Sequence, residues 1–287
     1  MVSIRAVGIV SKPKLQHAPE IVNGLLRWLE KRNVEFRCDE QTARYAAMKQ
    51  FYEREAVPDS TQLVIVLGGD GTLLSAARAI GGRDIPLFAV NLGGLGFLTA
   101  ITLDELYPEL ERAFRGEHRI GRRRMLDCEL IRNGEMVASF SALNDVVITK
   151  TMIARMIDLN AYVDNHFVST FKADGLIIST PTGSTAYSLA ANGPILTPDV
   201  DAMVVTPICP HLLTLRPIVV RGDASLSVRV EGIPNLALLT VDGQRAVELE
   251  LGDEIRCQRS THTVNLVRLA EGGFFDALRS KLSWGER

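Results

Sequence analysis

The segment LVIVLGGDGT, residues 63–72, decides how this chain folds. Its first five residues are all apolar, as expected for a strand that is buried on both faces of a parallel sheet. Three glycines then surround Asp70, and apolar residues at helical spacing follow as far as Ile80. Ligands of open parallel sheets bind beyond the carboxyl ends of the strands, and glycine lets a ligand approach the backbone closely. The segment therefore predicts both a fold class and a binding loop.

Strand and helix patterns alternate on both sides of this segment. The expected strands are 4–10, 34–38, 63–67 and 86–90, and the expected helices are 19–31, 73–80 and 102–114. The last of these helices contains Pro108, which predicts a kink or a restart there. Alternation of this kind is typical of a doubly wound parallel sheet with helices on its faces.

The pattern changes after about Gly121, where short β-type runs replace the alternation. Three pairs of runs flank the hairpin-type turns Asn133-Gly134, Asp164-Asn165 and Asp242-Gly243. Within this β-rich region only residues 185–192 have a helical pattern, and helical spacing returns in the tail at 274–282. We predict an α/β domain made of 1–121 and 270–287, whose C-terminal helix returns to it, and a β-rich domain made of 122–269.

Composition excludes several classes of protein. The 287 residues suggest two domains at ~150 residues each, and 46% hydrophobic with 23% charged residues is ordinary for a soluble protein. A net charge of −2 lacks the basic field of a nucleic-acid binder, and no apolar run approaches the ~18 residues of a membrane span. The cysteines are far apart and form no CxxC pair, which fits a cytoplasmic protein with free thiols. They are Cys38, Cys128, Cys209 and Cys257.

Asp70 is the most informative single residue of the first glycine loop. The loop residues Gly68, Gly69, Gly71 and Thr72 precede or open a helix, whose free N–H groups favour phosphate. A carboxylate beside phosphate is repelled unless it binds a metal, accepts a hydrogen bond from a hydroxyl group or removes a proton. Asp70 is therefore a candidate general base that acts on a sugar hydroxyl. The alternative is a plain strand-to-helix turn with Asp70 as its N-cap, and for an isolated GGDG motif the two interpretations stand about even.

Three other stretches carry polar residues or glycines in places that suggest a site. The loop NLGGLGF, residues 91–97, loosely resembles a dinucleotide fingerprint, and the alternative is a glycine-rich turn that packs against the first loop. Asn144-Asp145 lies among apolar residues and suits ribose hydroxyls or an adenine edge, unless it is a bulge or a strand end that faces water. Residues 180–190 are rich in hydroxyl groups and include Tyr187, which suits a ligand loop or a capped helix.

Taken together, the ordered motifs of this chain resemble those of NAD kinases. They are GGDGT at 68–72, NLG at 91–93 with GFL at 96–98, ND at 144–145, DG at 174–175, STPTGSTAYS at 179–188, PH at 210–211, RP at 216–217, DGQ at 242–244, and LR at 278–279 with KL at 281–282 and WG at 284–285. GGDGT alone is shared with lipid kinases of the diacylglycerol kinase type and, loosely, with phosphofructokinases. TPTGSTAYSLAANGP, residues 180–194, is far more specific, and the motifs span nearly the whole chain.

The resemblance implies phosphorylation of the 2′-hydroxyl of the adenosine ribose of NAD, with ATP, another nucleotide or polyphosphate as donor. It implies that Asp70 accepts the proton and positions the ribose, that Asp145 lies near a ribose, and that Asn144 lies near the adenosine half. Asp174 and residues 185–190 would bind the nicotinamide and adenine ends, partly from a neighbouring subunit. The full set of implied NAD contacts is Asp70, Gly71, Asn144, Asp145, Arg155, Lys172, Asp174, Thr185, Ala186, Tyr187, Ser188, Leu189, Ala190 and Gln244.

The resemblance also implies a divalent metal ion, Mg²⁺, that the phosphate donor carries, with no metal site formed by the protein. It implies a homo-oligomer, dimer or tetramer, in which the β-rich domains meet. No side-chain motif marks the donor site. Two rival functions share some of the motifs. One is a GGDGT lipid kinase, for which the sequence offers no membrane-facing patch, and the other is a non-catalytic sensor of NAD or NADP.

Overall fold

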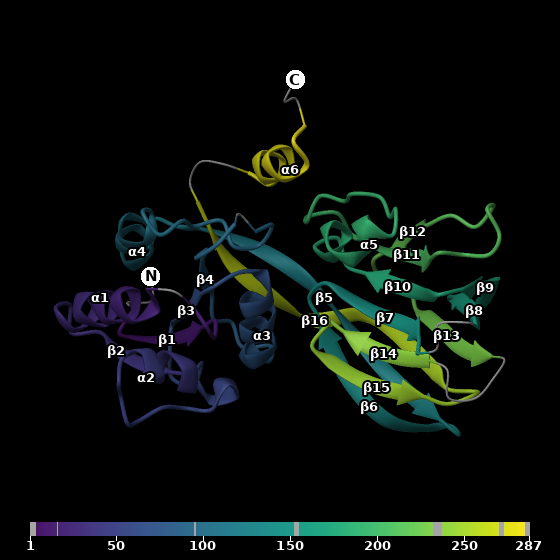
Figure 1. Cartoon of the computed structure of the whole chain (residues 1–287), viewed down its shortest axis with the longest axis horizontal. Coiled ribbons are helices and arrows are strands. Elements are labelled where there is room, and N and C mark those ends of the chain that lie inside the picture. Colours follow the sequence, from purple (N-terminus) through teal and green to yellow (C-terminus); the bar gives the residue numbers. More distant parts are fainter. Residues whose placement is uncertain are drawn as a thin grey trace. The chain divides into compact units, whose positions relative to one another are not determined.

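The computed structural model describes residues 4–15, 17–94, 96–151, 155–231, 237–269 and 273–284. Leu95 of the second glycine loop and Gly285 of the tail motif lie outside these described residues. The chain forms two compact units, one made of Met1–Arg122 and Val264–Arg287 and the other of Arg123–Thr263 (Figure 1). Residues 264–269, assigned above to the β-rich domain, belong to the first unit. No helix in the described ranges is long and apolar enough to cross a membrane.

Unit 1, which contains both termini, is built around a parallel sheet. Its strands are β1 (Ala6–Ser11), β2 (Glu35–Cys38), β3 (Leu63–Leu67), β4 (Leu87–Val90) and the end of β16 (Glu254–Arg268). They lie in the order β2-β1-β3-β4-β16, and each neighbouring pair is parallel. Since β2 and β3 lie on opposite sides of β1, the chain reverses its direction across the sheet between β1 and β3. Such a switch point is where ligands bind in folds of this class.

The helices of unit 1 largely follow the predicted pattern. They are α1 (Ala18–Glu30), α2 (Glu40–Tyr45), the 3₁₀ turn η1 (Arg54–Ala56), α3 (Asp70–Ile80), α4 (Leu106–Phe114) and α6 (Phe274–Leu282). Buried apolar side chains of α1 and α4 pack on the sheet strands in one cluster. The helix α3 ends where glycine predicts, because Gly81 adopts the left-handed conformation with φ of 56°.

Two helix starts differ from the prediction. The helix α3 begins at Asp70 rather than Leu73, because Gly69 is extended and takes the N-cap position. The helix α4 begins at Leu106, because the Glu105 carboxylate accepts the N–H and hydroxyl of Thr102, both at 2.8 Å, ahead of the helix. Pro108 therefore lies in the first turn of α4, where its missing N–H has no helical partner to lose, and α4 is one unbroken helix from Leu106 to Phe114.

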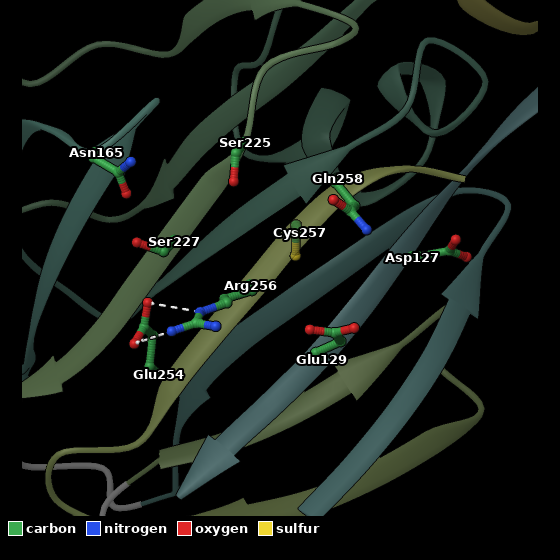
Figure 2. A pocket seen from close by; sticks show the side chains of 9 residues that line it. All are labelled: Asp127, Glu129, Asn165, Ser225, Ser227, Glu254, Arg256, Cys257 and Gln258. Carbon is green, nitrogen blue, oxygen red and sulfur yellow. Dashed lines mark hydrogen bonds and ion pairs between the residues drawn. The ribbon is translucent and has the colours of Figure 1, made fainter. Parts of the chain in front are cut away.

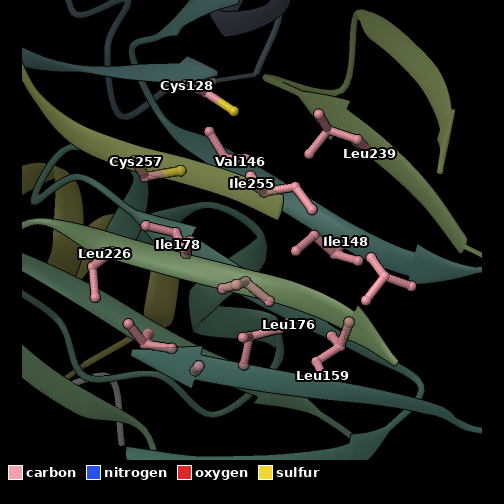
Figure 3. Packing of buried hydrophobic residues seen from close by; sticks show 14 of the residues in the cluster. Cys128, Val146, Ile148, Leu159, Leu176, Ile178, Leu226, Leu239, Ile255 and Cys257 are labelled. Carbon is pink, nitrogen blue, oxygen red and sulfur yellow. The ribbon is translucent and has the colours of Figure 1, made fainter. Parts of the chain in front are cut away.

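Unit 2 is β-rich. Its strands are β5 (Arg119–Arg132), which begins in unit 1, β6 (Glu135–Ala142), β7 (Asp145–Lys150), β8 (Ile157–Val163), β9 (His166–Ala173), β10 (Gly175–Ser179), β11 (Ala202–Ile208), β12 (Ile218–Arg221), β13 (Leu226–Glu231), β14 (Ala237–Val241), β15 (Arg245–Leu249) and the start of β16. One sheet has the order β12-β11-β10-β7-β14-β15. The other contains β5, β6, β8, β9, β13 and β16, and the inner faces of both contribute to one apolar core (Figure 3).

The predicted hairpin turns of unit 2 are confirmed. Asn133, Asp164 and Asp242 have positive φ angles of 51°, 48° and 50°, as turns of this type require. The expected helix at 185–192 is shorter and consists of the 3₁₀ turn η2 (Gly183–Thr185) and the four-residue α5 (Tyr187–Ala190). The apolar patterns of residues 254–258 and 263–269 predict two short strands, but the structure has one continuous strand there, β16.

Candidate functional site

Asp70 lies at the carboxyl end of β3, beside the switch point of the sheet. Its Oδ2 accepts the Phe97 N–H at 3.0 Å. Its Oδ1 accepts the N–H groups of Leu98 and Thr99, both at 3.2 Å, and the Thr99 hydroxyl at 3.1 Å. At Gly96 an added Cβ atom would overlap the Asp70 carboxylate. The second glycine loop is therefore a turn that packs against the first, as its alternative interpretation predicts.

Asn91 shapes the same turn from its other end. Its side-chain oxygen accepts the Gly93 N–H at 2.8 Å, and its amide nitrogen donates to the Gly94 carbonyl at 2.9 Å. The residue is buried, and its backbone N–H is bonded to the Ile101 carbonyl. Asn91 thus shapes the second glycine loop from within, and the Asp70 carboxylate joins that loop to the first.

The hydrogen bonds leave one acceptor position on Asp70. A carboxylate oxygen has two lone pairs, and three donors already crowd Oδ1. Among the described residues Oδ2 accepts only the Phe97 N–H. A general base must have an acceptor atom within reach of the hydroxyl proton that it removes. Oδ2 is the atom that meets this requirement.

Different physical constraints act on the three glycines around Asp70. An added Cβ at Gly68 would lie 2.5 Å from the Thr72 hydroxyl, so packing requires glycine there. At Gly69 and Gly71 an added Cβ meets no described atom within 4 Å, and neither residue has a positive φ. The fold of unit 1 therefore does not explain these two glycines, whereas clearance for a ligand does.

We expect the Gly69→Ala variant to keep its stability and lose activity. Its free energy of unfolding should change by less than about 1 kcal/mol, because the new methyl group meets no described atom within 4 Å. Its kcat/KM should fall at least tenfold, because the methyl group enters the space that a ligand needs. Urea unfolding and steady-state kinetics measure the two effects. Gly68→Ala is the contrasting variant and should be destabilised, and a fully active Gly69→Ala would contradict the interpretation.

In unit 2 the Asp242 carboxylate binds three successive backbone N–H groups. Its Oδ2 accepts from Leu143 at 2.9 Å, and its Oδ1 accepts from Asn144 at 2.8 Å and from Asp145 at 3.1 Å. The Asp242 N–H in turn donates to the Asp145 carbonyl at 2.9 Å. These bonds fix the place where the chain leaves β6 and enters β7 in the other sheet. They also set the positions of the two polar residues that the sequence singled out.

The Asp145 side chain is 5% exposed, with little water to stabilise its charge. Burial and the nearby negative charge of Asp242 raise the pKa of Asp145 from 3.8 to about 7, although a hydrogen bond from the Tyr187 N–H works in the opposite direction. Desolvation is the larger cause. At neutral pH Asp145 therefore populates both forms, and it can either accept or donate a hydrogen bond to a ligand hydroxyl.

Asn144 lies between this carboxyl and the segment at 179–190. Its carbonyl accepts the Thr180 N–H at 2.9 Å, and an added Cβ at Gly183 would overlap the same carbonyl. The Thr180 hydroxyl donates to the Leu143 carbonyl at 2.6 Å. The Asn144 side-chain amide is partly exposed and has no hydrogen-bond partner among the described residues. The structure thus brings Asn144, Asp145 and the exposed Tyr187 together, with one amide available to a ligand.

Asp174 lies at the other end of the same strands. β7 and β10 are antiparallel, with Asp145 opposite Ser179 and Thr149 opposite Gly175. About five residues at ~3.3 Å each separate the two aspartates, or roughly 16 Å. The Asp174 carboxylate is 2.5 Å from the Lys150 ammonium. Within one chain the structure does not bring Asp174 together with Asn144 and Asp145.

The remaining predicted contacts fall into two groups. Arg155 and Lys172 are exposed, and Gln244 is half-buried just after the Asp242 turn. Two hydroxyl groups of the 185–190 segment have partners in the chain instead. The Ser188 hydroxyl is buried and hydrogen-bonded to that of Thr206 at 2.9 Å, and the Thr185 hydroxyl donates to the Thr182 carbonyl at 3.1 Å. These two hydroxyl groups shape the segment. Its other side chains are exposed to different extents: Tyr187 and Ala190 are exposed, and Ala186 and Leu189 are partly exposed.

A groove of about 420 Å³ lies elsewhere on unit 2. Its lining is mostly polar, and Glu254 and Arg256 are hydrogen-bonded to each other at 3.0 and 3.2 Å (Figure 2). None of the predicted site residues lines it. Among the residues that the structure describes, no group of three or more His, Cys, Asp or Glu side chains is arranged to hold a metal ion.

Both units match models of known domain families. Residues 7–118 match the ATP-NAD kinase N-terminal domain, and residues 143–269 match the ATP-NAD kinase C-terminal domain. The chain belongs to the NAD kinase family. An NAD kinase of Solibacter usitatus is 56% identical over 284 residues, which cover 99% of each chain. An NAD kinase of Acidobacterium capsulatum is 52% identical over 285 residues, which cover 99% of this chain and 100% of the relative.

Solved NAD kinase structures share the fold. The crystal structure of yeast NADH kinase complexed with NADH has a TM-score of 0.92 at 25% identity and covers 100% of this chain and 90% of its own. An NAD kinase from Archaeoglobus fulgidus in complex with ATP has a TM-score of 0.77 at 25% identity, with coverage of 97% and 98%. The predicted fold class, an α/β unit with a parallel sheet followed by a β-rich unit and a C-terminal helix, is confirmed.

Local sequence patterns do not reveal the residues that hold this candidate site in place. Asp242 was recognised only as part of a hairpin turn, although its carboxylate binds three N–H groups about 100 residues earlier in the chain. Thr99 was not singled out at all. The only signal for Asp242 was its place in the DGQ motif, because a local pattern does not reveal which distant N–H groups a carboxylate will meet.

Proposed function

We propose that this chain is an NAD kinase that transfers the γ-phosphoryl group of ATP to the 2′-hydroxyl of the adenosine ribose of NAD, giving NADP and ADP. The observation that carries the proposal is the Asp70 carboxylate at the switch point of the sheet, with one acceptor position left on Oδ2. Membership of the NAD kinase family supports it, as does a relative named NAD kinase at 56% identity over nearly the full length.

In this reaction the 2′-oxygen attacks the γ-phosphorus of ATP. A new O–P bond forms, the bond from the γ-phosphorus to the bridging oxygen breaks, and ADP leaves with that electron pair. The hydroxyl proton passes to Oδ2 of Asp70. Phosphoryl transfer depends mainly on positioning and charge stabilisation, and base assistance contributes roughly 10²–10⁴-fold. The hydrogen bonds from residues 97–99 keep the carboxylate in one orientation for this step.

We further propose that Asn144, Asp145 and the segment at 185–190 bind NAD. The free amide of Asn144 suits the donor and acceptor groups of the adenosine half, and the Asp145 carboxyl suits ribose hydroxyls. The Tyr187 ring is 44% exposed and offers a face on which a base can stack. The Asp242 carboxylate prepares this surface by fixing the backbone of all three residues from Leu143 to Asp145.

We expect the Asn144→Ala variant to bind NAD about fivefold more weakly, because one hydrogen bond to a ligand is worth roughly 1 kcal/mol. Stability should change little, since the side-chain amide has no partner among the described residues. Isothermal titration calorimetry with NAD measures the dissociation constant. Asn160→Ala is the control, because the amide of Asn160 on β8 is hydrogen-bonded to Thr170 on β9 and Glu231 on β13. An unchanged dissociation constant for Asn144→Ala would show that the Asn144 side chain does not contact NAD.

The metal ion of this reaction is proposed to be Mg²⁺ carried by the phosphates of ATP, whose charge it neutralises. The carboxylates of the site fit hydroxyl groups better than they fit a metal ion. Asp70 already accepts four hydrogen bonds from its own chain, and Asp145 is buried. A Mg²⁺ ion usually keeps several of its waters and takes substrate phosphates as ligands, so ATP can carry it without a metal site built by the protein.

We also propose that the protein works as a cytoplasmic homo-oligomer, a dimer or tetramer. Asp174 is roughly 16 Å along the strands from Asp145, which suits contact with NAD bound to a second copy. Lys172 is exposed two residues before it, and Arg155 is exposed at the start of the strand pair β8–β9. The edge strand β9 also exposes Phe167 to 58%, a side chain that a second copy would bury.

The proposal is tested by asking which acceptor becomes labelled. The protein is incubated with Mg²⁺, γ-³²P-labelled ATP and NAD in the presence of vesicles that contain diacylglycerol. Label in NADP alone is the expected result, and the label should be lost on removal of the 2′-phosphate. Label in the lipid and none in NADP would overturn the proposal in favour of a GGDGT lipid kinase.

A further inference from the structure

The C-terminal helix α6 of unit 1 carries a motif, Leu278-Arg279 with Lys281-Leu282, that the proposed function leaves without a role. Leu278 is 2% exposed and anchors the helix on the unit. The helix ends at Leu282, because Ser283 adopts the left-handed conformation with φ of 51°. Lys281 therefore lies in the last turn of a helix that is held in place by a buried side chain.

The Lys281 side chain contacts the loop that holds Asp70. Its ammonium nitrogen lies 4.8 Å from the centroid of the Phe97 ring, within the range of a cation–π contact. Phe97 donates its backbone N–H to Oδ2 of Asp70, the oxygen that we assign as the proton acceptor. One residue, Phe97, thus contacts both the proton acceptor and the lysine cation.

Lys281 brings a positive charge that the described part of the chain does not neutralise. The side chain is exposed and forms no ion pair with a described residue. Arg279, two residues earlier on the same helix, is ion-paired with Asp276. A flexible lysine stem carries a point charge that can leave an aromatic face and bind phosphate when phosphate is present.

We propose that Lys281 binds the terminal phosphate of the donor, a nucleoside triphosphate or inorganic polyphosphate, and stabilises the negative charge of the transferring group. This inference rests on the proposed function. Phosphoryl transfer requires cations at the non-bridging oxygens of the moving group. The first glycine loop contributes N–H groups and space but no cationic side chain. The α6 lysine supplies the cation next to the base, and the Phe97 ring holds the ammonium nearby until the donor binds.

The test compares Lys281→Met with Lys281→Arg and with Arg279→Met. Methionine keeps an unbranched apolar stem against Phe97 while it removes the charge, and Arg279→Met removes a paired charge from the same helix. For Lys281→Met we expect kcat/KM for ATP to fall ten- to a hundredfold, with the NAD dissociation constant and the melting temperature unchanged. Lys281→Arg should recover most of that loss, and Arg279→Met should stay within twofold of the wild type.

A binding measurement separates this inference from the proposed function. Calorimetry with tripolyphosphate should show at least tenfold weaker binding to Lys281→Met than to the wild type, whether or not NADP is formed. Equal tripolyphosphate affinity, or a kcat/KM for ATP within twofold of the wild type, would overturn the role of Lys281. A wild type that binds tripolyphosphate through Lys281 but forms no NADP would contradict the proposed function and leave the phosphate site standing.

Discussion

The Asp70→Asn variant is expected to lose most of its turnover, with kcat lower by roughly 10²–10⁴-fold. Asparagine is close in shape to aspartate but accepts no proton at neutral pH. Asp70 is the only carboxylate of the first glycine loop, so that loop offers no substitute for it. NAD binding should persist, because the proposed NAD contacts at Asn144, Asp145 and residues 185–190 remain unchanged. Steady-state kinetics and calorimetry with NAD measure the two properties separately.

This substitution also has a structural effect that a control must isolate. The amide nitrogen of asparagine donates hydrogen bonds, so one of the four donors that Asp70 now receives loses its acceptor, at a cost of about 1–3 kcal/mol. Thr99→Val removes one of these bonds and keeps the carboxylate. We expect kcat of Thr99→Val within tenfold of the wild type. An equal loss of kcat in Asp70→Asn and Thr99→Val would mean that Asp70 acts only by holding the loop. A near-normal kcat in Asp70→Asn would show that Asp70 is not the general base.

The Asp145→Asn variant is expected to be more stable than the wild type above pH 7, by about 2–4 kcal/mol, and to bind NAD at least tenfold more weakly. The pKa of Asp145 is about 7 in the folded chain and 3.8 ordinarily. This difference means that folding disfavours the ionised carboxylate by roughly 4 kcal/mol relative to the protonated carboxyl. Between these values the folded chain binds more protons than the unfolded chain. The free energy of unfolding therefore falls as pH rises from about 4 to 7.

Asparagine at position 145 removes the buried charge that lowers the stability of the folded chain as pH rises. It retains an oxygen for the Tyr187 N–H bond, and it no longer places a negative charge beside Asp242. Urea unfolding at pH 5 and pH 8 should show that the wild type loses stability over this range and that Asp145→Asn loses much less. Asp174→Asn is the comparison variant, because it makes the same chemical change at a carboxylate that is paired with Lys150. If the free energy of unfolding changed equally with pH in the wild type and in Asp145→Asn, the raised pKa of Asp145 would be contradicted.

Local sequence patterns predicted the parts of this structure that local physics determines. The apolar run at 63–67 followed by GGDGT predicted a buried parallel strand that leads through a glycine loop into a helix, because burial on both faces and glycine freedom are properties of adjacent residues. The turns at Asn133, Asp164 and Asp242 were predicted because residues with positive φ are restricted to a few types. The start of α3 was wrong by three residues, because the extended Gly69 caps the helix without a side chain.

Features that depend on distant pairing were not predictable in this way. The continuous strand β16 was divided in two, because the polar residues Ser260, Thr261 and His262 interrupt its apolar pattern. β11 and β12 carry little signal beyond short apolar runs, and their position comes from pairing with β10. The role of Asp242 arises because β14 pairs with β7 about 90 residues earlier in the chain. The partners that hold the site in place were therefore visible only in three dimensions.

An end-point assay of the wild-type chain shows whether it converts NAD to NADP. The purified protein is incubated with NAD, ATP and Mg²⁺, and a dehydrogenase that accepts only NADP detects the product, while a parallel sample contains polyphosphate instead of ATP. We expect NADP in the sample with ATP, formed in proportion to the enzyme concentration. No NADP with either donor, while calorimetry shows that NAD binds, would contradict the proposed function.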